Sequence, residues 1–183
     1  MKRIRQAVKE LNDFFISNHL TTCDTLNIQS LAKMFDVHVV FYPDESCFLK
    51  IKQGGRQLNL ISIDERLTEF EKYEVFCHEL AHFLLKHKQE KSYLPFLINE
   101  MTADKLALHI AIPNYLIIDI DISSETVIAD ISETFGVSLA FATERLELLF
   151  SDMTNRKFRI DKEYVSNYKM WLSEEILNFG GTA

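Results

Sequence analysis

The sequence predicts an α+β fold, in which a small and mostly antiparallel sheet packs on the helix that carries residues 78–82. Three observations support this class. Apolar residues recur three or four positions apart, as in amphipathic helices, both before residue 37 and after residue 63. Runs rich in β-branched and aromatic residues are confined to residues 37–63. The 183 residues are 47% apolar and 26% charged, which suits a domain with a hydrophobic core and argues against disorder.

Two amphipathic helices are expected before the sheet. The first carries apolar residues at helical spacing, namely Ile4, Val8, Leu11 and Phe15. The second, shorter helix carries Ile28, Leu31, Ala32 and Phe35. Strands are then expected over residues 37–42, 47–52 and 57–63. Gly54 and Gly55 separate the last two runs and predict a hairpin between them.

The rest of the chain is predicted to be helical. Thr68 and Glu71 fit a capping box, from which a helix should run through His82 to about His87. A second helix should cover residues 98–111 and end before Pro113. Two more, at about 124–135 and 138–150, are hinged at Gly136. A last amphipathic helix is expected to carry Tyr164, Tyr168, Trp171 and Ile176. Residues 1–113 would form the core, and residues 114–183 a helical part packed on it within one domain.

Charge and apolar patterning restrict the partners and the compartment. The net charge of −7 argues against a protein that holds nucleic acid, and residues 114–150 contain seven acids against one base, Arg145. The longest apolar tract, at residues 106–118, is too interrupted to cross a membrane, and no signal peptide is apparent. Three cysteines without paired spacing suit a reducing compartment. We therefore expect a cytoplasmic protein that binds neither membrane nor nucleic acid.

Residues 78–82 read His-Glu-Leu-Ala-His, which is the His-Glu-x-x-His pattern of metallopeptidases. A spacing of four places His78 and His82 one turn apart on a single helix face, where both rings can bind one tetrahedral Zn²⁺ ion. Glu79 emerges beside them without being a ligand, and it can take a proton from a water that the ion binds. Cys77 points about 100° away from His78, so a small buried side chain is the expected role.

The third ligand decides which class of metallopeptidase the pattern indicates. The metzincin pattern requires a glycine and a histidine at positions that here hold Leu85 and Lys88, so that class is excluded. On the next helix, Glu100 could complete a site of two histidines, one glutamate and water. Asp104 lies one turn further and could accept the second ring proton of His78 or His82.

Such sites also contain a residue that stabilises the oxyanion. The sequence does not choose among four candidates for this role: Tyr73, Tyr93, His87 and His109.

Residues 76–85 resemble the active helix of the ImmA/IrrE metallopeptidases, a family common in phages and integrative elements. The run Glu100-x-x-Ala103-Asp104-x-x-Ala107 resembles that family's second signature, which closes at Ile112-Pro113. The likeness covers residues 28–149, and Ala81 departs from it where the family often has glycine. The Glu and Asp spacing is also similar to the thermolysin-like gluzincins, in which the glutamate binds zinc and the aspartate supports a histidine.

The resemblance implies a gluzincin-like core and a zinc endopeptidase that inactivates a helix-turn-helix repressor. An edge strand at residues 57–63 could, by analogy with gluzincins, hold the substrate backbone by strand addition. The alternative, from another class of function, is a protein that antagonises a repressor by contact alone, with a structural or vestigial metal site.

Overall fold

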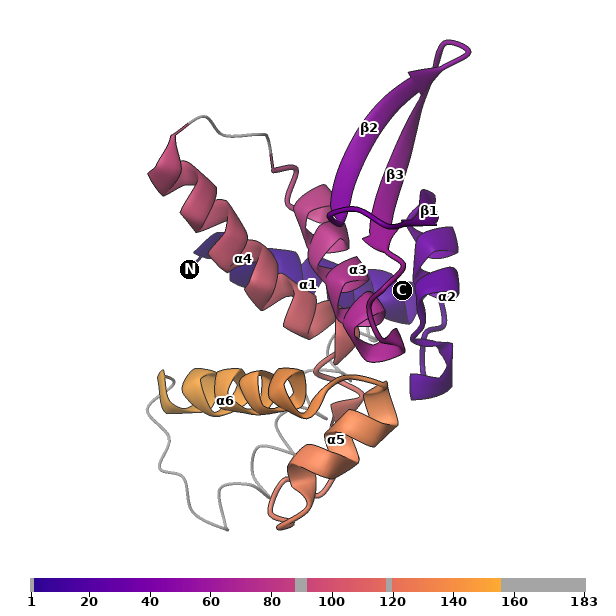
Figure 1. Ribbon diagram of the computed structural model, residues 1–183. Coiled ribbons are helices and arrows are strands. Elements are labelled where there is room, and N and C mark those ends of the chain that lie inside the picture. The colour runs from indigo at the N-terminus through magenta and orange to yellow at the C-terminus, as the bar shows by residue number, and fades with distance from the viewer. Residues whose placement is uncertain (1, 88–91, 118–119, 156–183) are drawn as a thin grey trace.

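The computed structural model describes residues 2–87, 92–117 and 120–155, and its helices and strands make an α+β fold as the sequence predicts (Figure 1). The last helix expected from the sequence, with Tyr164 and Trp171, lies outside the described residues. The elements follow in the order α1 (Lys2–Ser17), η1 (Cys23–Thr25), α2 (Ile28–Met34), β1 (Val37–Tyr42), β2 (Cys47–Gln53), β3 (Arg56–Asp64), α3 (Glu69–Leu84), α4 (Tyr93–Ala111), α5 (Val127–Phe135) and α6 (Leu139–Asn155).

The three strands form one mixed sheet in the order β1-β3-β2. The expected hairpin is present: β2 and β3 run antiparallel and turn at Gly54 and Gly55, whose φ angles of 57° and 78° favour glycine. β1 instead pairs parallel to β3, from Val37 opposite Asn59 to Tyr42 opposite Asp64. The sheet thus combines the antiparallel pair with one parallel pair.

β3 is therefore the central strand, and the expectation that residues 57–63 form an edge strand is wrong. Ile61 and Ile63 of β3 are fully buried, and neighbouring strands cover both of the strand's hydrogen-bonding edges. Of the sheet's two edge strands, β2 packs more extensively on α3, where the Phe48 and Phe83 rings lie 5.3 Å apart. β1 approaches α3 where the Lys72 ammonium lies 5.8 Å from the Phe41 ring. β2 is thus the edge strand that packs more extensively on α3.

α3 packs between the sheet and α4 and begins at the predicted capping box. The Thr68 side chain accepts a hydrogen bond from the Glu71 amide, and the Glu71 carboxylate accepts one from the Thr68 amide at 2.8 Å. Phe76 and Leu80 of α3 are fully buried, as are Ile61 and Ile63 of β3, and all belong to one hydrophobic core. This packing fixes α3 firmly against the sheet.

The described helices differ from the predicted ones mainly at their ends. α3 ends at Leu84, short of His87, and α5 begins at Val127, not 124. α4 begins at Tyr93 and not at residue 98. Pro95 then falls within the first turn of α4, where its missing amide proton breaks no helical hydrogen bond. None of the described helices is long and apolar enough to cross a membrane.

Hydrogen bonds of Glu74 and of Arg145 join α6 to the core. The Glu74 carboxylate of α3 accepts a hydrogen bond from the Ser138 amide at 2.5 Å, at the N-terminal end of α6, where a negative charge is favourable. Arg145 is fully buried and donates from Nε to the Ile112 carbonyl at 3.0 Å and from a terminal nitrogen to the Asn114 side chain. Arg145 thus links α6 to the end of α4.

Replacement of Arg145 should destabilise the fold strongly. Arg145→Ala leaves a cavity and removes the donors that face Ile112 and Asn114, so the free energy of unfolding should fall by about 3–5 kcal/mol. Urea denaturation measures this change. Arg66→Ala is the matched control, because Arg66 is exposed and pairs with Asp64 at the surface; it should change stability little. Equal effects of the two substitutions would contradict this role of Arg145.

Candidate metal centre

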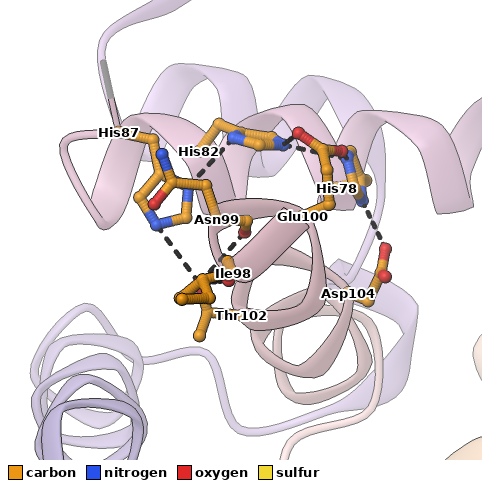
Figure 2. Close-up of polar contacts among 8 residues, drawn as sticks. All are labelled: His78, His82, His87, Ile98, Asn99, Glu100, Thr102 and Asp104. Carbon is orange, nitrogen blue, oxygen red and sulfur yellow. Dashed lines mark hydrogen bonds and ion pairs between the residues drawn. The ribbon is translucent and has the colours of Figure 1, made fainter. Parts of the chain in front are cut away.

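The candidate centre lies where α3 faces α4, and both helices contribute side chains to it (Figure 2). His78 and His82 extend from successive turns of α3, and their Nε2 atoms lie 3.0 Å apart. Glu100 of α4 faces both rings, with its oxygens 3.3 Å from Nε2 of His78 and 3.5 Å from Nε2 of His82. All three side chains are partly buried. The structure thus brings the three predicted ligands together.

These three separations suit a tetrahedral metal ion. Zinc binds histidine nitrogen and carboxylate oxygen at about 2.0–2.1 Å, which places neighbouring ligand atoms of a tetrahedron about 3.3 Å apart. The two Nε2 atoms are 3.0 Å apart, and each lies 3.3 or 3.5 Å from a different oxygen of Glu100. One ligand atom from each side chain lies within 4.8 Å of the others. Among the described residues, one group of at least three histidine, cysteine or acidic side chains lies close enough together to hold a metal ion. It consists of His78, His82 and Glu100.

Asp104 lies against His78 and determines which of its ring nitrogens carries the proton. The Nδ1 atom of His78 is 2.9 Å from an Asp104 oxygen. Because an ionised carboxylate only accepts hydrogen bonds, the ring donates its Nδ1 proton, and the Nε2 of the neutral ring keeps a lone pair. That lone pair faces His82 and Glu100, an arrangement that a bound cation stabilises. Of the two histidines that Asp104 could support, it contacts His78.

The surroundings shift the pKa values of the two histidines in opposite directions. For His78, burial lowers the pKa, but the hydrogen bond to Asp104 and the charges of Glu79, Asp104 and Glu100 outweigh burial and raise it above 6.5. For His82, burial and the neighbouring His78 ring lower the pKa below 6.5. His82 therefore loses its proton at a lower pH than His78.

Glu79 is the α3 residue next to His78, and its side chain faces strand β2 of the sheet. Burial raises the pKa of its carboxyl above 4.5, and the charge of Glu100 raises it further, while His78 and a backbone hydrogen bond from Phe48 of β2 lower it. The amide of Phe48 therefore faces this carboxylate from the edge strand. A carboxylate with a raised pKa at a metal centre is a suitable proton acceptor.

The four candidates for stabilising an oxyanion lie in different surroundings. Tyr73 is buried in the core, and His109 is buried beside Arg145, where burial holds its pKa well below 6.5. Tyr93 is exposed on the first turn of α4. His87 lies at the centre, with both ring nitrogens in hydrogen-bonding contact with other side chains. Cys77 is fully buried, as expected for a cysteine that faces away from the ligands.

The sequence did not indicate that Thr102 or β2 belongs to this region. Thr102 contacts His87 across the interface between the helices, and Phe48 of β2 faces Glu79. A threonine within a helix and an apolar residue in a strand are both common, so neither carries a recognisable signal. Only the packing of distant segments brings them to the site.

Comparison with known proteins indicates the family to which the chain belongs. None of the curated proteins matches the chain. The model of the Peptidase_M78 family, described as the IrrE N-terminal-like domain, matches residues 32–147. The match covers more than half of the chain, from α2 to α6, and includes all the candidate ligands. It also agrees with the resemblance to the ImmA/IrrE proteins seen in the sequence. The chain therefore belongs to the Peptidase_M78 family of metallopeptidase-type proteins.

Proposed function

We propose that this protein is a zinc-dependent endopeptidase of the gluzincin type. The observation that carries the proposal is the convergence of His78, His82 and Glu100, whose closest nitrogen and oxygen atoms are 3.0–3.5 Å apart, with Glu79 beside them. Membership of a peptidase family supports it. Two neutral imidazoles and one carboxylate are the ligands of zinc in many hydrolytic sites, where a fourth position stays open for water or substrate.

In this proposal His78, His82 and Glu100 hold the ion and Asp104 orients His78. Bound zinc lowers the pKa of water and polarises the carbonyl of a peptide bond. Glu79 accepts the proton of the attacking water and then delivers it to the leaving amine. The Phe48 amide, which hydrogen-bonds the Glu79 carboxylate, orients this group from the sheet side.

The free edge of β2 is the proposed binding site for the substrate backbone. An extended peptide can add a strand to such an edge through main-chain hydrogen bonds. Since the amide of Phe48 hydrogen-bonds the Glu79 carboxylate, we infer that it faces the free edge of β2. Since strand residues alternate, the backbone groups of Lys50 should face the same free edge. A peptide paired there would lie next to the candidate centre.

A helix-turn-helix repressor is the proposed substrate, and kinship and charge support it. The resemblance to the ImmA/IrrE proteins implies such a substrate. DNA-binding proteins carry basic surfaces, and the described segment beyond residue 120 presents acidic side chains that complement one: Glu125, Glu133, Glu144 and Glu147 are exposed. Arg145, the one base of residues 114–150, is buried. This surface therefore suits a basic protein better than a DNA phosphate backbone.

The first turns of α4 provide an additional apolar surface next to the centre, which suits a protein substrate. Its exposed side chains are Tyr93, Leu94, Phe96, Leu97, Ile98 and Met101.

Glu79→Gln should abolish cleavage while zinc remains bound. The amide keeps the shape of the side chain but cannot accept the proton, so kcat should fall about 100-fold or more. The measurement is cleavage of a candidate repressor, together with the zinc content of the variant. Glu69→Gln, an exposed position on the same helix, is the control and should be fully active. A Glu79→Gln protein that retains zinc and inactivates the repressor as well as wild type would indicate a non-proteolytic anti-repressor instead.

Zinc affinity should fall when the pH is lowered through the pKa of His78. Zinc binds only the neutral ring, and the pKa of His78 without metal is raised above 6.5. Below that pKa one proton must leave for each ion bound, so affinity should drop by up to about tenfold per pH unit. Competition with a chelator of known affinity at pH 8 and pH 6 measures this. Equal affinity at both values would contradict the assignment of His78 as a ligand.

Lys50→Pro should weaken binding of the substrate without unfolding the sheet. Proline removes an amide proton at the free edge of β2 and is tolerated where that proton is not used by a neighbouring strand. KM should rise, whereas zinc content and thermal stability should stay near wild type. Lys50→Ala is the matched control, because it removes the charge and keeps the amide. If both variants bind substrate equally well, β2 does not hold the substrate backbone.

A further inference from the structure

His87 occupies a defined place because of the way α3 ends. Leu85 is the C-terminal cap, and Lys86 follows in the left-handed conformation with a φ of 55°. The Lys86 amide donates to the Phe83 carbonyl and the His87 amide to the His82 carbonyl, both at 3.1 Å. These two hydrogen bonds define a Schellman motif, which brings the side chains of residues 82 and 87 together. This contact is frequently apolar, whereas here both side chains are imidazoles.

The two rings meet through nitrogen atoms. Nδ1 of His87 lies 3.0 Å from Nδ1 of His82, on the side of the His82 ring opposite the Nε2 that faces the candidate centre. On its other side, Nε2 of His87 lies 3.3 Å from the Thr102 hydroxyl oxygen of α4 (Figure 2). His87 thus connects His82 to the second helix of the site.

The contacts from His82 to His87 and from His87 to Thr102 form a series. The donor and the acceptor of each hydrogen bond in this series follow from Thr102, its last member. The Thr102 hydroxyl lies 2.9 Å from the Ile98 carbonyl and 3.0 Å from the Asn99 carbonyl. A carbonyl only accepts, so the hydroxyl proton must be donated there, and the hydroxyl oxygen accepts a proton from Nε2 of His87. A neutral His87 then has a lone pair on Nδ1, which accepts the Nδ1 proton of His82. His82 is left with its lone pair on Nε2.

We propose that His87, supported by Thr102, is a positioning residue that fixes the tautomer and ring orientation of the metal ligand His82. Asp104 does the same for His78, so each ligand histidine has its own partner on Nδ1. Partners of this kind orient metal-binding histidines and raise their affinity for the ion. The role rests on the proposed zinc site, and it removes His87 from the candidates for an oxyanion group, because both of its nitrogens are occupied.

Zinc affinity of a set of variants tests this role. His87→Ala should weaken zinc binding by about 10- to 100-fold in a chelator competition. His87→Asn should restore most of that loss, because the amide oxygen replaces Nδ1 as the acceptor. Thr102→Val should produce a smaller loss than His87→Ala, since it removes only the group that holds His87. His38→Ala, an exposed histidine on β1, is the matched control and should bind zinc like wild type.

Two further measurements separate positioning from a purely structural role. NMR of the ¹⁵N-labelled, zinc-loaded protein should show His82 protonated at Nδ1 in wild type and lose that slowly exchanging proton in His87→Ala. Thermal unfolding of the metal-free variants should show that His87→Ala and His87→Asn are equally stable. If both variants lose zinc affinity and stability alike, His87 only stabilises the packing of the two helices, and the proposal fails.

The same series distinguishes failure of this role from failure of the proposed function. A wild-type protein that binds no zinc would refute the zinc site itself. A wild type that binds zinc, with His87→Ala bound equally tightly, would refute only the positioning role of His87.

Discussion

The close packing of α3 on α4 is the constraint on which the rest of the site depends. Two candidate ligands come from α3 and the third from α4, so the ligand atoms reach tetrahedral spacing only if the helix backbones approach closely. Ala81 of α3 and Ala103 and Ala107 of α4 are buried in the hydrophobic core that both helices share, and small side chains permit such an approach. A larger side chain at any of these positions would move Glu100 away from the histidines.

α4 also holds the partners that orient the histidines and connects the site to the C-terminal helices. Asp104 contacts His78 directly, and Thr102 contacts His82 through His87. Both histidines therefore present lone pairs to the same space, and the carboxylate of Glu100 faces them. Such a concentration of acceptors is unfavourable by itself and is stabilised by a cation. At its other end, α4 is fixed to α6 by the buried Arg145, so the site is supported on both sides.

The parts of the site that follow from helical periodicity could be predicted from the sequence. His78 and His82, and likewise Glu100 and Asp104, are each four residues apart, and the helix itself then determines their common face. The hairpin at Gly54 and Gly55 was predictable for a similarly local reason. The central position of β3 was not, because strand order depends on contacts between segments far apart in the chain. The role of His87 was missed because Lys86, which reverses the chain after α3, is not the glycine expected at such a position.

The geometry brings two imidazoles and one carboxylate together with Glu79 beside them, and membership of a metallopeptidase-type family supports the proposal that they hold zinc. X-ray absorption spectroscopy of the zinc-loaded protein tests that claim most directly. The account predicts one zinc per chain with four nitrogen or oxygen neighbours at about 2.0–2.1 Å, and imidazole scattering from two histidines. A sulfur neighbour at about 2.3 Å, which would implicate a cysteine, or a purified protein that takes up no zinc, would contradict it.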